Sequence, residues 1–125
     1  MKTITMKFGG TSVGSPEAIA NLVNIVKQSR DEGNRVIVVV SAMSGVTDQL
    51  LNSVKMAAGG NKWGYLSTAN KIRDRHDDAI NILVPPGQVR EKALGQIKSL
   101  LDEFTEICQA VSILGEETPR ISDAI

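Results

Sequence analysis

The sequence predicts an α/β protein in which a strand, a helix and a second strand are followed by several helices. Residues 3–8 form a short alternating segment that runs into glycines, residues 36–40 are all β-branched, and apolar residues after Ser41 recur at helical spacing. A strand–helix–strand unit normally joins parallel strands, so the loops that follow both strands reach the same edge of the sheet. We therefore expect function at that edge.

The first helix has clear start and stop signals. Ser15 is suited to cap it, Pro16 to occupy its first position, and Gly33 to end it. The strand at residues 36–40 is apolar throughout, which is typical of a strand that helices cover on both faces. The helix residues expected to be buried are Ile19, Leu22, Val23 and Val26.

Three more helices are expected at residues 46–57, 66–83 and 89–114, with a flexible connector at 59–62. A further helix opens at Thr118 and is cut off at Ile125. Two strands are few for this class, whose sheets have about five or six, so the chain is expected to be truncated. The third of these helices carries the clearest core-facing stripe, which comprises Ile97, Leu100, Leu101, Phe104, Ile107, Cys108, Val111 and Leu114.

Composition limits the partners and the compartment. Fourteen Lys and Arg balance fourteen Asp and Glu, so no excess charge favours nucleic acid or an anionic membrane surface. The first residues lack an apolar core long enough for a signal peptide or a membrane span. Cys108 is the only cysteine, which excludes an internal disulfide framework or a multi-cysteine metal cluster and suits a reducing cytoplasm. We expect a soluble, cytoplasmic protein.

The first glycine-rich loop has the composition of a phosphate site. Gly9, Gly10, Thr11 and Ser12 follow a strand and precede a capped helix, where backbone N–H groups and the helix dipole favour an anion. Lys7 would add a positive charge, and the two hydroxyls would add donors. It is not a Walker loop, because the G-x-x-x-x-G-K-[ST] order is absent. The alternative is a plain glycine turn after a strand.

The second loop, at residues 41–47, leaves the second strand at the same edge and also leads into a helix. It carries the hydroxyls of Ser41, Ser44 and Thr47 and one glycine. The alternative is that Ser44 or Thr47 is merely a helix N-cap. Two helix N-termini at one crevice can hold an anionic donor and an anionic acceptor, which is the geometry that a small-molecule kinase requires.

Residues 7–13, Lys-Phe-Gly-Gly-Thr-Ser-Val, resemble the N-terminal signature of aspartate kinases, and residues 41–47, Ser-Ala-Met-Ser-Gly-Val-Thr, resemble their second motif. Gly115-Glu116, Thr118-Pro119-Arg120 and Asp123 are similar to the segment that follows the helical region in that family. The resemblance implies an amino-acid kinase fold, an α/β/α sandwich. Residues 1–125 would be the N-terminal part of its catalytic domain.

The resemblance also implies an activity. Aspartate kinases use ATP and Mg²⁺ to phosphorylate the side-chain carboxylate of L-aspartate, the first step toward lysine, threonine and methionine. Carried over, Ser41 and Thr47 would contact aspartate. The family's next motif, a Ser-Phe-Gly-Glu type segment whose glutamate contacts the amino acid, would begin beyond Ile125, so the chain alone is expected to be inactive and to self-associate. The residues expected to hold the ATP phosphates are Lys7, also the expected catalytic residue, with Gly9, Gly10, Thr11 and Ser12.

Two other functions stay open at this point. One is an amino-acid kinase for glutamate or acetylglutamate, and the other is a non-catalytic anion-binding or assembly module. Outside the loops, His76 is interpreted as a partly buried, satisfied histidine rather than a pocket residue, and Cys108 as an inert core thiol. The charged run at residues 73–78 is interpreted as a solvated helix face, and no metal site is expected.

Overall fold

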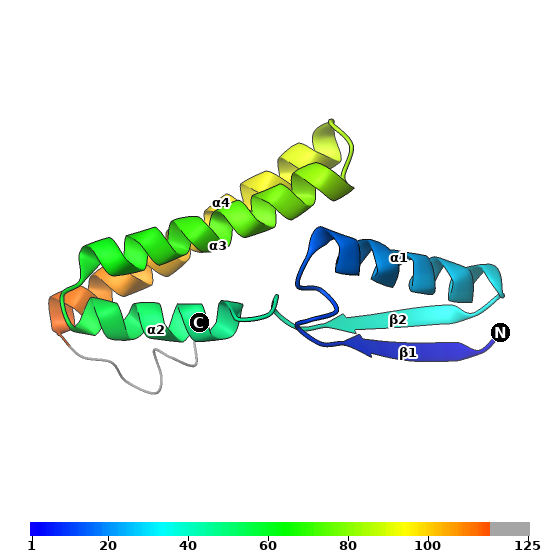
Figure 1. Cartoon of the computed structure of the whole chain (residues 1–125), viewed down its shortest axis with the longest axis horizontal. Coiled ribbons are helices and arrows are strands. Elements are labelled where there is room, and N and C mark those ends of the chain that lie inside the picture. The colour runs from blue at the N-terminus through cyan, green and yellow to red at the C-terminus, as the bar shows by residue number, and fades with distance from the viewer. Residues whose placement is uncertain (116–125) are drawn as a thin grey trace. The chain divides into compact units, whose positions relative to one another are not determined.

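A computed structural model describes residues 1–115, which fall into two compact units, Met1–Thr47 and the residues from Asp48 onward (Figure 1). The mixed α/β class is confirmed, and the helix expected from Thr118 lies outside the described residues. The elements are, in chain order, β1 (Thr3–Phe8), α1 (Pro16–Asp31), β2 (Arg35–Val40), α2 (Val46–Ala58), α3 (Lys62–Leu83) and α4 (Gln88–Leu114).

The first unit is the expected strand–helix–strand. β1 and β2 are parallel, with Phe8 opposite Val40 at their carboxyl ends. The Ser15 side chain caps α1 by accepting a hydrogen bond of 3.1 Å from the N–H of Ala18. Gly33, just past the C-terminus of α1, has φ of +90°, a left-handed conformation that favours glycine. These signals begin and end the helix where the sequence predicts.

Within the first unit, α1 covers only part of one face of this two-stranded sheet, because Val38 and Val40 on the same face as Val36 are 40% and 55% exposed. The register places Ile4, Met6 and Phe8 on the face of Val36, where they are half-buried, and α1 packs against β2 (Figure 1). The opposite face carries Ile37 and Val39, which are 48% and 44% exposed. The expected cover on both faces is therefore not found within residues 1–47. Val23, expected to be buried, is also exposed, because a two-stranded sheet is too narrow to cover the whole apolar stripe of α1.

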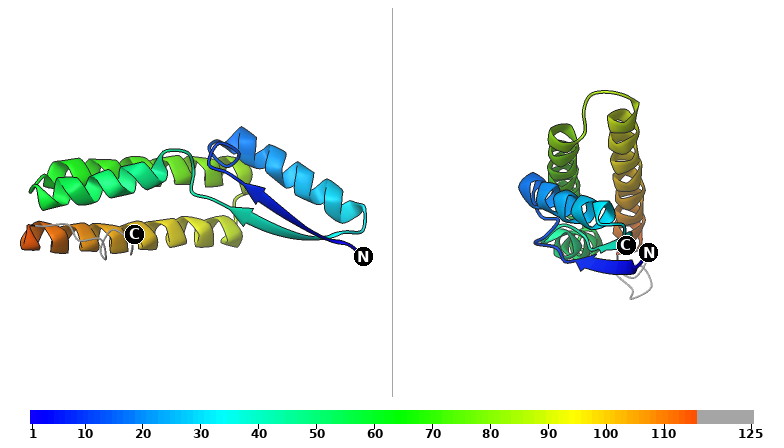
Figure 2. Two further views of the ribbon diagram at one scale, coloured as in Figure 1. Left: turned by 90° about the horizontal axis from the view of Figure 1, so that it is seen from below. Right: turned by 90° about the vertical axis from the view of Figure 1, so that its right-hand side faces the viewer.

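The second unit is built on a hairpin of α3 and α4. The two helices run antiparallel, side by side, and residues 84–87 connect them (Figure 2). The Arg90 side chain donates hydrogen bonds to the carbonyls of Val84 and Asn81 at 2.7 and 2.5 Å. α3 begins four residues earlier than predicted, because the side chain of Asn61 accepts a 2.9 Å bond from the N–H of Gly64 and caps it. The expected flexible connector is thus shorter than residues 59–62.

A hydrophobic core forms where α2 joins this hairpin. α2 has 13 residues and α4 has 27, which correspond to lengths of about 20 Å and about 40 Å, so α2 covers only part of the hairpin. The predicted stripe is confirmed at Phe104, Cys108 and Val111 but is wrong at Leu100 and Leu114, which are 62% and 66% exposed. Leu100 lies away from the three-helix core and Leu114 in the last turn of α4. The buried core residues are Val54, Ala57, Tyr65, Ala69, Phe104, Cys108 and Val111.

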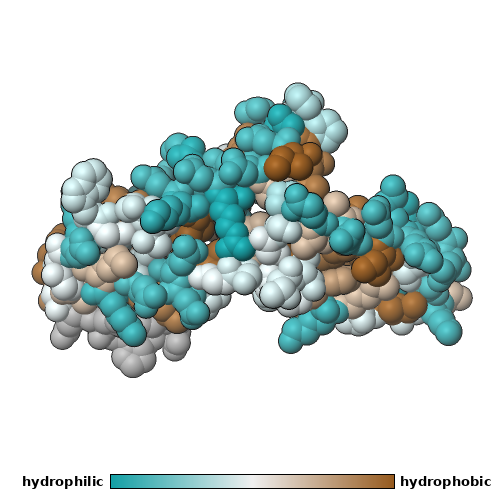
Figure 3. Space-filling model, viewed as in Figure 1, coloured by the Kyte–Doolittle hydropathy of each residue, from teal (hydrophilic) through white to brown (hydrophobic). Residues whose placement is uncertain are grey.

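The visible surface mixes polar and apolar residues (Figure 3). None of the helices within residues 1–115 is long and apolar enough to span a membrane.

Candidate functional site

The two loops predicted to carry chemistry lie side by side at one end of the parallel sheet (Figure 1). The N–H of Ser41 donates to the carbonyl of Phe8 at 3.1 Å, which extends the strand pairing by one residue. One step further, the N–H of Ser44 donates to the carbonyl of Gly10 at 3.0 Å. All seven predicted site residues belong to the first unit, and the structure brings the two loops together as the crossover rule predicts.

The first loop is two successive tight turns that lead to the N-terminus of α1. The N–H of Ser12 donates to the carbonyl of Gly9 at 3.0 Å, and the N–H of Gly14 donates to the carbonyl of Thr11 at 3.3 Å. Among residues 1–115, no acceptor pairs with the backbone N–H of Gly10 or of Thr11. Two backbone N–H groups without a protein acceptor, close to a helix N-terminus, can donate to an oxyanion.

Lys7 lies one residue before the end of β1, opposite Val39, on the sheet face that α1 leaves uncovered. Its side chain is exposed, and no carboxylate in the described part of the chain pairs with it. The ammonium charge is therefore not neutralised within that part of the chain. A flexible, unpaired lysine at a strand end can contact phosphate oxygens as a mobile point charge.

In the second loop, the hydroxyl of Ser41 is exposed and donates to the carbonyl of Ala42 at 2.8 Å. Thr47 is also exposed and is the second residue of α2, which begins at Val46 after Gly45. Thr47 thus lies inside the first helical turn, so the interpretation of Thr47 as the N-cap is wrong. Thr47 is the last residue of the first unit.

Each loop also buries apolar side chains that sequence reasoning overlooked. Val13 in the first loop is 8% exposed, and Met43 and Val46 in the second are 7% and 5% exposed. Burying a side chain in a glycine- and hydroxyl-rich loop restricts the loop to one conformation. A large apolar residue within an otherwise polar, glycine-rich loop was the feature of the sequence that could have predicted this burial.

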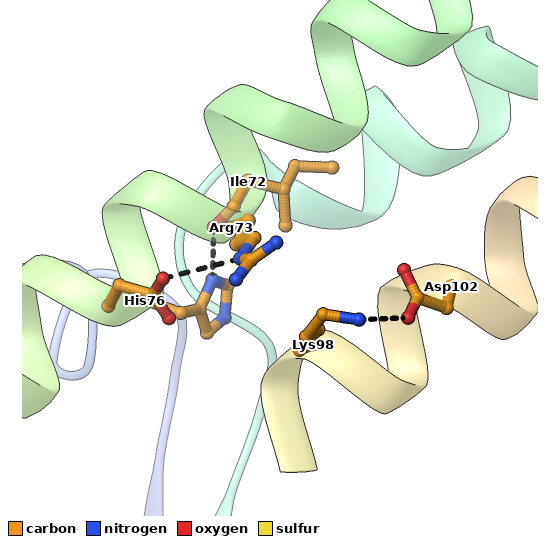
Figure 4. A network of polar contacts seen from close by, with 6 residues as sticks. Ile72, Arg73, His76, Lys98 and Asp102 are labelled. Carbon is orange, nitrogen blue, oxygen red and sulfur yellow. Dashed lines mark hydrogen bonds and ion pairs between the residues drawn. The ribbon is translucent and has the colours of Figure 1, made fainter. Parts of the chain in front are cut away.

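His76 on α3 has no role in these loops. Its Nδ1 lies 2.7 Å from the carbonyl oxygen of Ile72, one turn earlier, and the ring is partly buried (Figure 4). The interpretation as a satisfied, partly buried histidine is confirmed. Within the described residues, no group of three or more His, Cys, Asp or Glu side chains is arranged to hold a metal ion.

The charged run that begins at Arg73 is only partly a solvated face. Arg73 pairs with Asp77 at 3.4 Å, and the Asp77 side chain is 23% exposed, with no partner for its Oδ1 in the described part of the chain. On α4, Lys98 and Asp102 form an exposed pair at 2.8 Å (Figure 4). Asp74 and Asp78 are exposed, as predicted.

Cys108 lies in the three-helix core and is fully buried. Burial raises the pKa of its thiol to about 11, because the thiolate would lose its hydration. At neutral pH the thiol stays protonated and is a poor nucleophile. The interpretation as an inert core residue is confirmed.

Comparison with known proteins identifies relatives. The family model described as "Amino acid kinase family" matches residues 2–119. The chain is 34% identical over 119 residues to "Bifunctional aspartokinase/homoserine dehydrogenase 1, chloroplastic" of Zea mays, which covers 95% of this chain and 12% of the relative. It is 49% identical over 59 residues to "Aspartate kinase" of Pseudomonas fluorescens, covering 47% and 14%. It is 53% identical over 55 residues to "Aspartokinase" of Bacillus sp. MGA3, covering 44% and 13%. The matched residues thus cover only 12–14% of the length of these relatives.

Proposed function

Because the chain belongs to the amino acid kinase family, we propose that it is the N-terminal part of an aspartate kinase catalytic domain. The parent protein would transfer the γ-phosphate of ATP to the side-chain carboxylate of L-aspartate, giving 4-phospho-L-aspartate. The names of the three relatives favour this substrate. The observation that carries the proposal is the pair of loops joined by the bond from Ser44 to Gly10, with unpaired amide donors in the first loop.

Phosphoryl transfer depends mainly on positioning the substrates and on stabilising the charge that develops. In the proposal, the amides of Gly10 and Thr11 donate to phosphate oxygens and Lys7 places its charge on them. In the same proposal, Gly9 and Ser12 also lie against the phosphates. The hydroxyls of Ser41 and Thr47 contact aspartate from the neighbouring loop.

Mg²⁺ belongs to the substrate in this proposal. Protein sites that process ATP commonly bind Mg²⁺ through the phosphates and only one or two carboxylates. We propose that the ion arrives bound to the ATP phosphates. A single cysteine leaves no pair for an internal disulfide, which suits a reducing compartment, and we propose the cytoplasm. We also propose that the parent protein is a homo-oligomer.

A kinase for glutamate or acetylglutamate is the nearest rival, and a panel of the three carboxylates assayed with the full-length parent separates them. Turnover with aspartate alone supports the proposal, and faster turnover with glutamate or acetylglutamate contradicts it. A non-catalytic module would give no ADP release with any of them, even when the chain is assayed within the full-length parent.

The direct test is Lys7→Ala in the full-length parent. Loss of a preorganised charge on the phosphates should lower kcat/KM for aspartate phosphorylation by about 10²-fold or more. Lys2→Ala is a matched control, because Lys2 is an exposed lysine at the opposite end of β1, about 16 Å away by strand rise. The melting temperature of both variants should stay near that of the wild type. A kcat/KM for Lys7→Ala within about threefold of the wild type would rule out the phosphate role.

A further inference from the structure

The adjacent glycines of the first loop have different surroundings. A Cβ atom on Gly9 would meet nothing within 4 Å. A Cβ atom on Gly10 would lie 3.1 Å from the carbonyl oxygen of Ala42 and 3.2 Å from both the N and the Cα of Ser44. Neither glycine has a positive φ, so the backbone conformation does not demand glycine at either position. The close approach of the second loop leaves little room for a side chain on Gly10.

The carbonyl of Gly10 is held as closely as its Cα. It accepts the 3.0 Å bond from the N–H of Ser44, and a Cβ atom on Gly14 would lie only 2.9 Å from it. The peptide that carries this carbonyl is therefore surrounded by backbone from both loops. Backbone atoms, unlike the end of a flexible side chain, cannot move aside without shifting the loop.

We infer that Gly10 is a positioning residue, which fixes the second loop to the first so that the two loops form one rigid piece. Gly9, in contrast, has open space around it in the protein and is the position at which a bound phosphate can approach the backbone. The phosphate part of this inference rests on the proposed function, whereas the joining of the loops does not. If both substrates bind as proposed, Gly10 supports both binding loops and Gly9 only the nucleotide loop.

Amide hydrogen exchange on the ligand-free 125-residue chain tests the joining of the loops. In the wild type, the N–H groups of Ser41 and Ser44 should exchange at similarly protected rates, because one opening event exposes both. Gly9→Ala should leave the protection of Ser44 within about threefold of the wild type, and Gly10→Ala should reduce it by about tenfold or more. Equal protection of Ser44 in the two variants overturns the inference. So does a Ser44 amide that exchanges freely in the wild type while Ser41 is protected, which keeps the test decisive if Gly10→Ala does not fold.

Steady-state kinetics of the full-length parent test the functional consequence. Gly10→Ala should raise KM for both ATP and aspartate, and Gly9→Ala should raise it for ATP only. If the exchange results are as expected and neither variant changes either KM, the loops are joined but the proposed substrate sites are wrong. If both variants raise KM for ATP alone, the two loops do not act as one piece in the enzyme and the inference fails.

Discussion

Replacing Phe104 by alanine removes the largest apolar side chain of the three-helix core. Phe104 is 6% exposed and packs in a cluster to which α2, α3 and α4 all contribute. Phenylalanine-to-alanine changes in cores cost about 3–5 kcal/mol, and alanine recovers up to about 0.5 kcal/mol through its helix propensity. We expect the free energy of unfolding to fall by about 3–4 kcal/mol.

Leu100→Ala is the matched control for that change. Leu100 lies one turn earlier on the same helix, and was predicted from the same stripe, but it is 62% exposed. Full burial of a leucine contributes about 1.5–3 kcal/mol, so a side chain that is largely exposed should contribute about 1 kcal/mol or less. The two substitutions therefore differ mainly in how deeply the replaced side chain is buried, because both lie in the same part of α4.

Urea unfolding followed by circular dichroism at 222 nm measures both changes. A shift of the transition midpoint with an unchanged m-value reports the change in the free energy of unfolding. A similar loss of stability for both variants would mean that α2 does not cover α4 as described. If Phe104→Ala lowered the free energy of unfolding by less than about 1 kcal/mol, the three-helix core would not be the main source of stability in the second unit.

Three more predictions concern the site, the thiol and the isolated chain. Thr47→Val in the full-length parent should raise KM for aspartate with little change in apparent ATP affinity, and the reverse pattern would reassign the second loop to the nucleotide. Burial raises the pKa of the Cys108 thiol from 9.0 to about 11, so the thiol ionises more readily in the unfolded chain than in the folded one. The free energy of unfolding should therefore be unaffected by this thiol below pH 9 and should fall as the pH rises from 9 toward 11. The wild type should then lose up to about 2–3 kcal/mol more than Cys108→Ala over that interval in urea unfolding, and parallel curves would disprove the shift. The 125-residue chain alone should show no aspartate kinase turnover and should self-associate through exposed apolar residues such as Ile37 and Val39. ADP release that depends on aspartate, or a monomer by light scattering at high concentration, would contradict these two expectations.

Local signals predicted the first unit almost to the residue. Ser15, Pro16 and Gly33 act on the chain within one helical turn, so their effect does not depend on distant packing. The start of α3 was missed because Asn61 was taken as part of a glycine connector, although its side chain is a good N-cap. The recognised cap thus placed the start of α1 correctly, and the unrecognised one displaced the start of α3.

Burial was harder to predict than helix or strand. The periodicity of α4 places Leu100 and Phe104 on one side, but only the position of α2 decides that one is exposed and the other buried. For the candidate site, too, the arrangement of elements was predictable but the detailed contacts were not. Strand order predicted that the two loops would meet, whereas the contact of Gly10 with Ser44 depends on their separation, which no pattern of residue types encodes.

The parallel pairing of β1 with β2 also affects the order of folding. Thr3 pairs with Arg35, 32 positions away, so the strands can join only after the chain between them has closed into a loop. The α3–α4 hairpin needs contacts between neighbours joined by a short turn, and such local contacts form faster. We expect helical signal to recover before the amides of β2 become protected in refolding with pulsed hydrogen exchange, and simultaneous recovery would contradict this. The two loops would then assemble after the α3–α4 hairpin, although they precede it in the sequence.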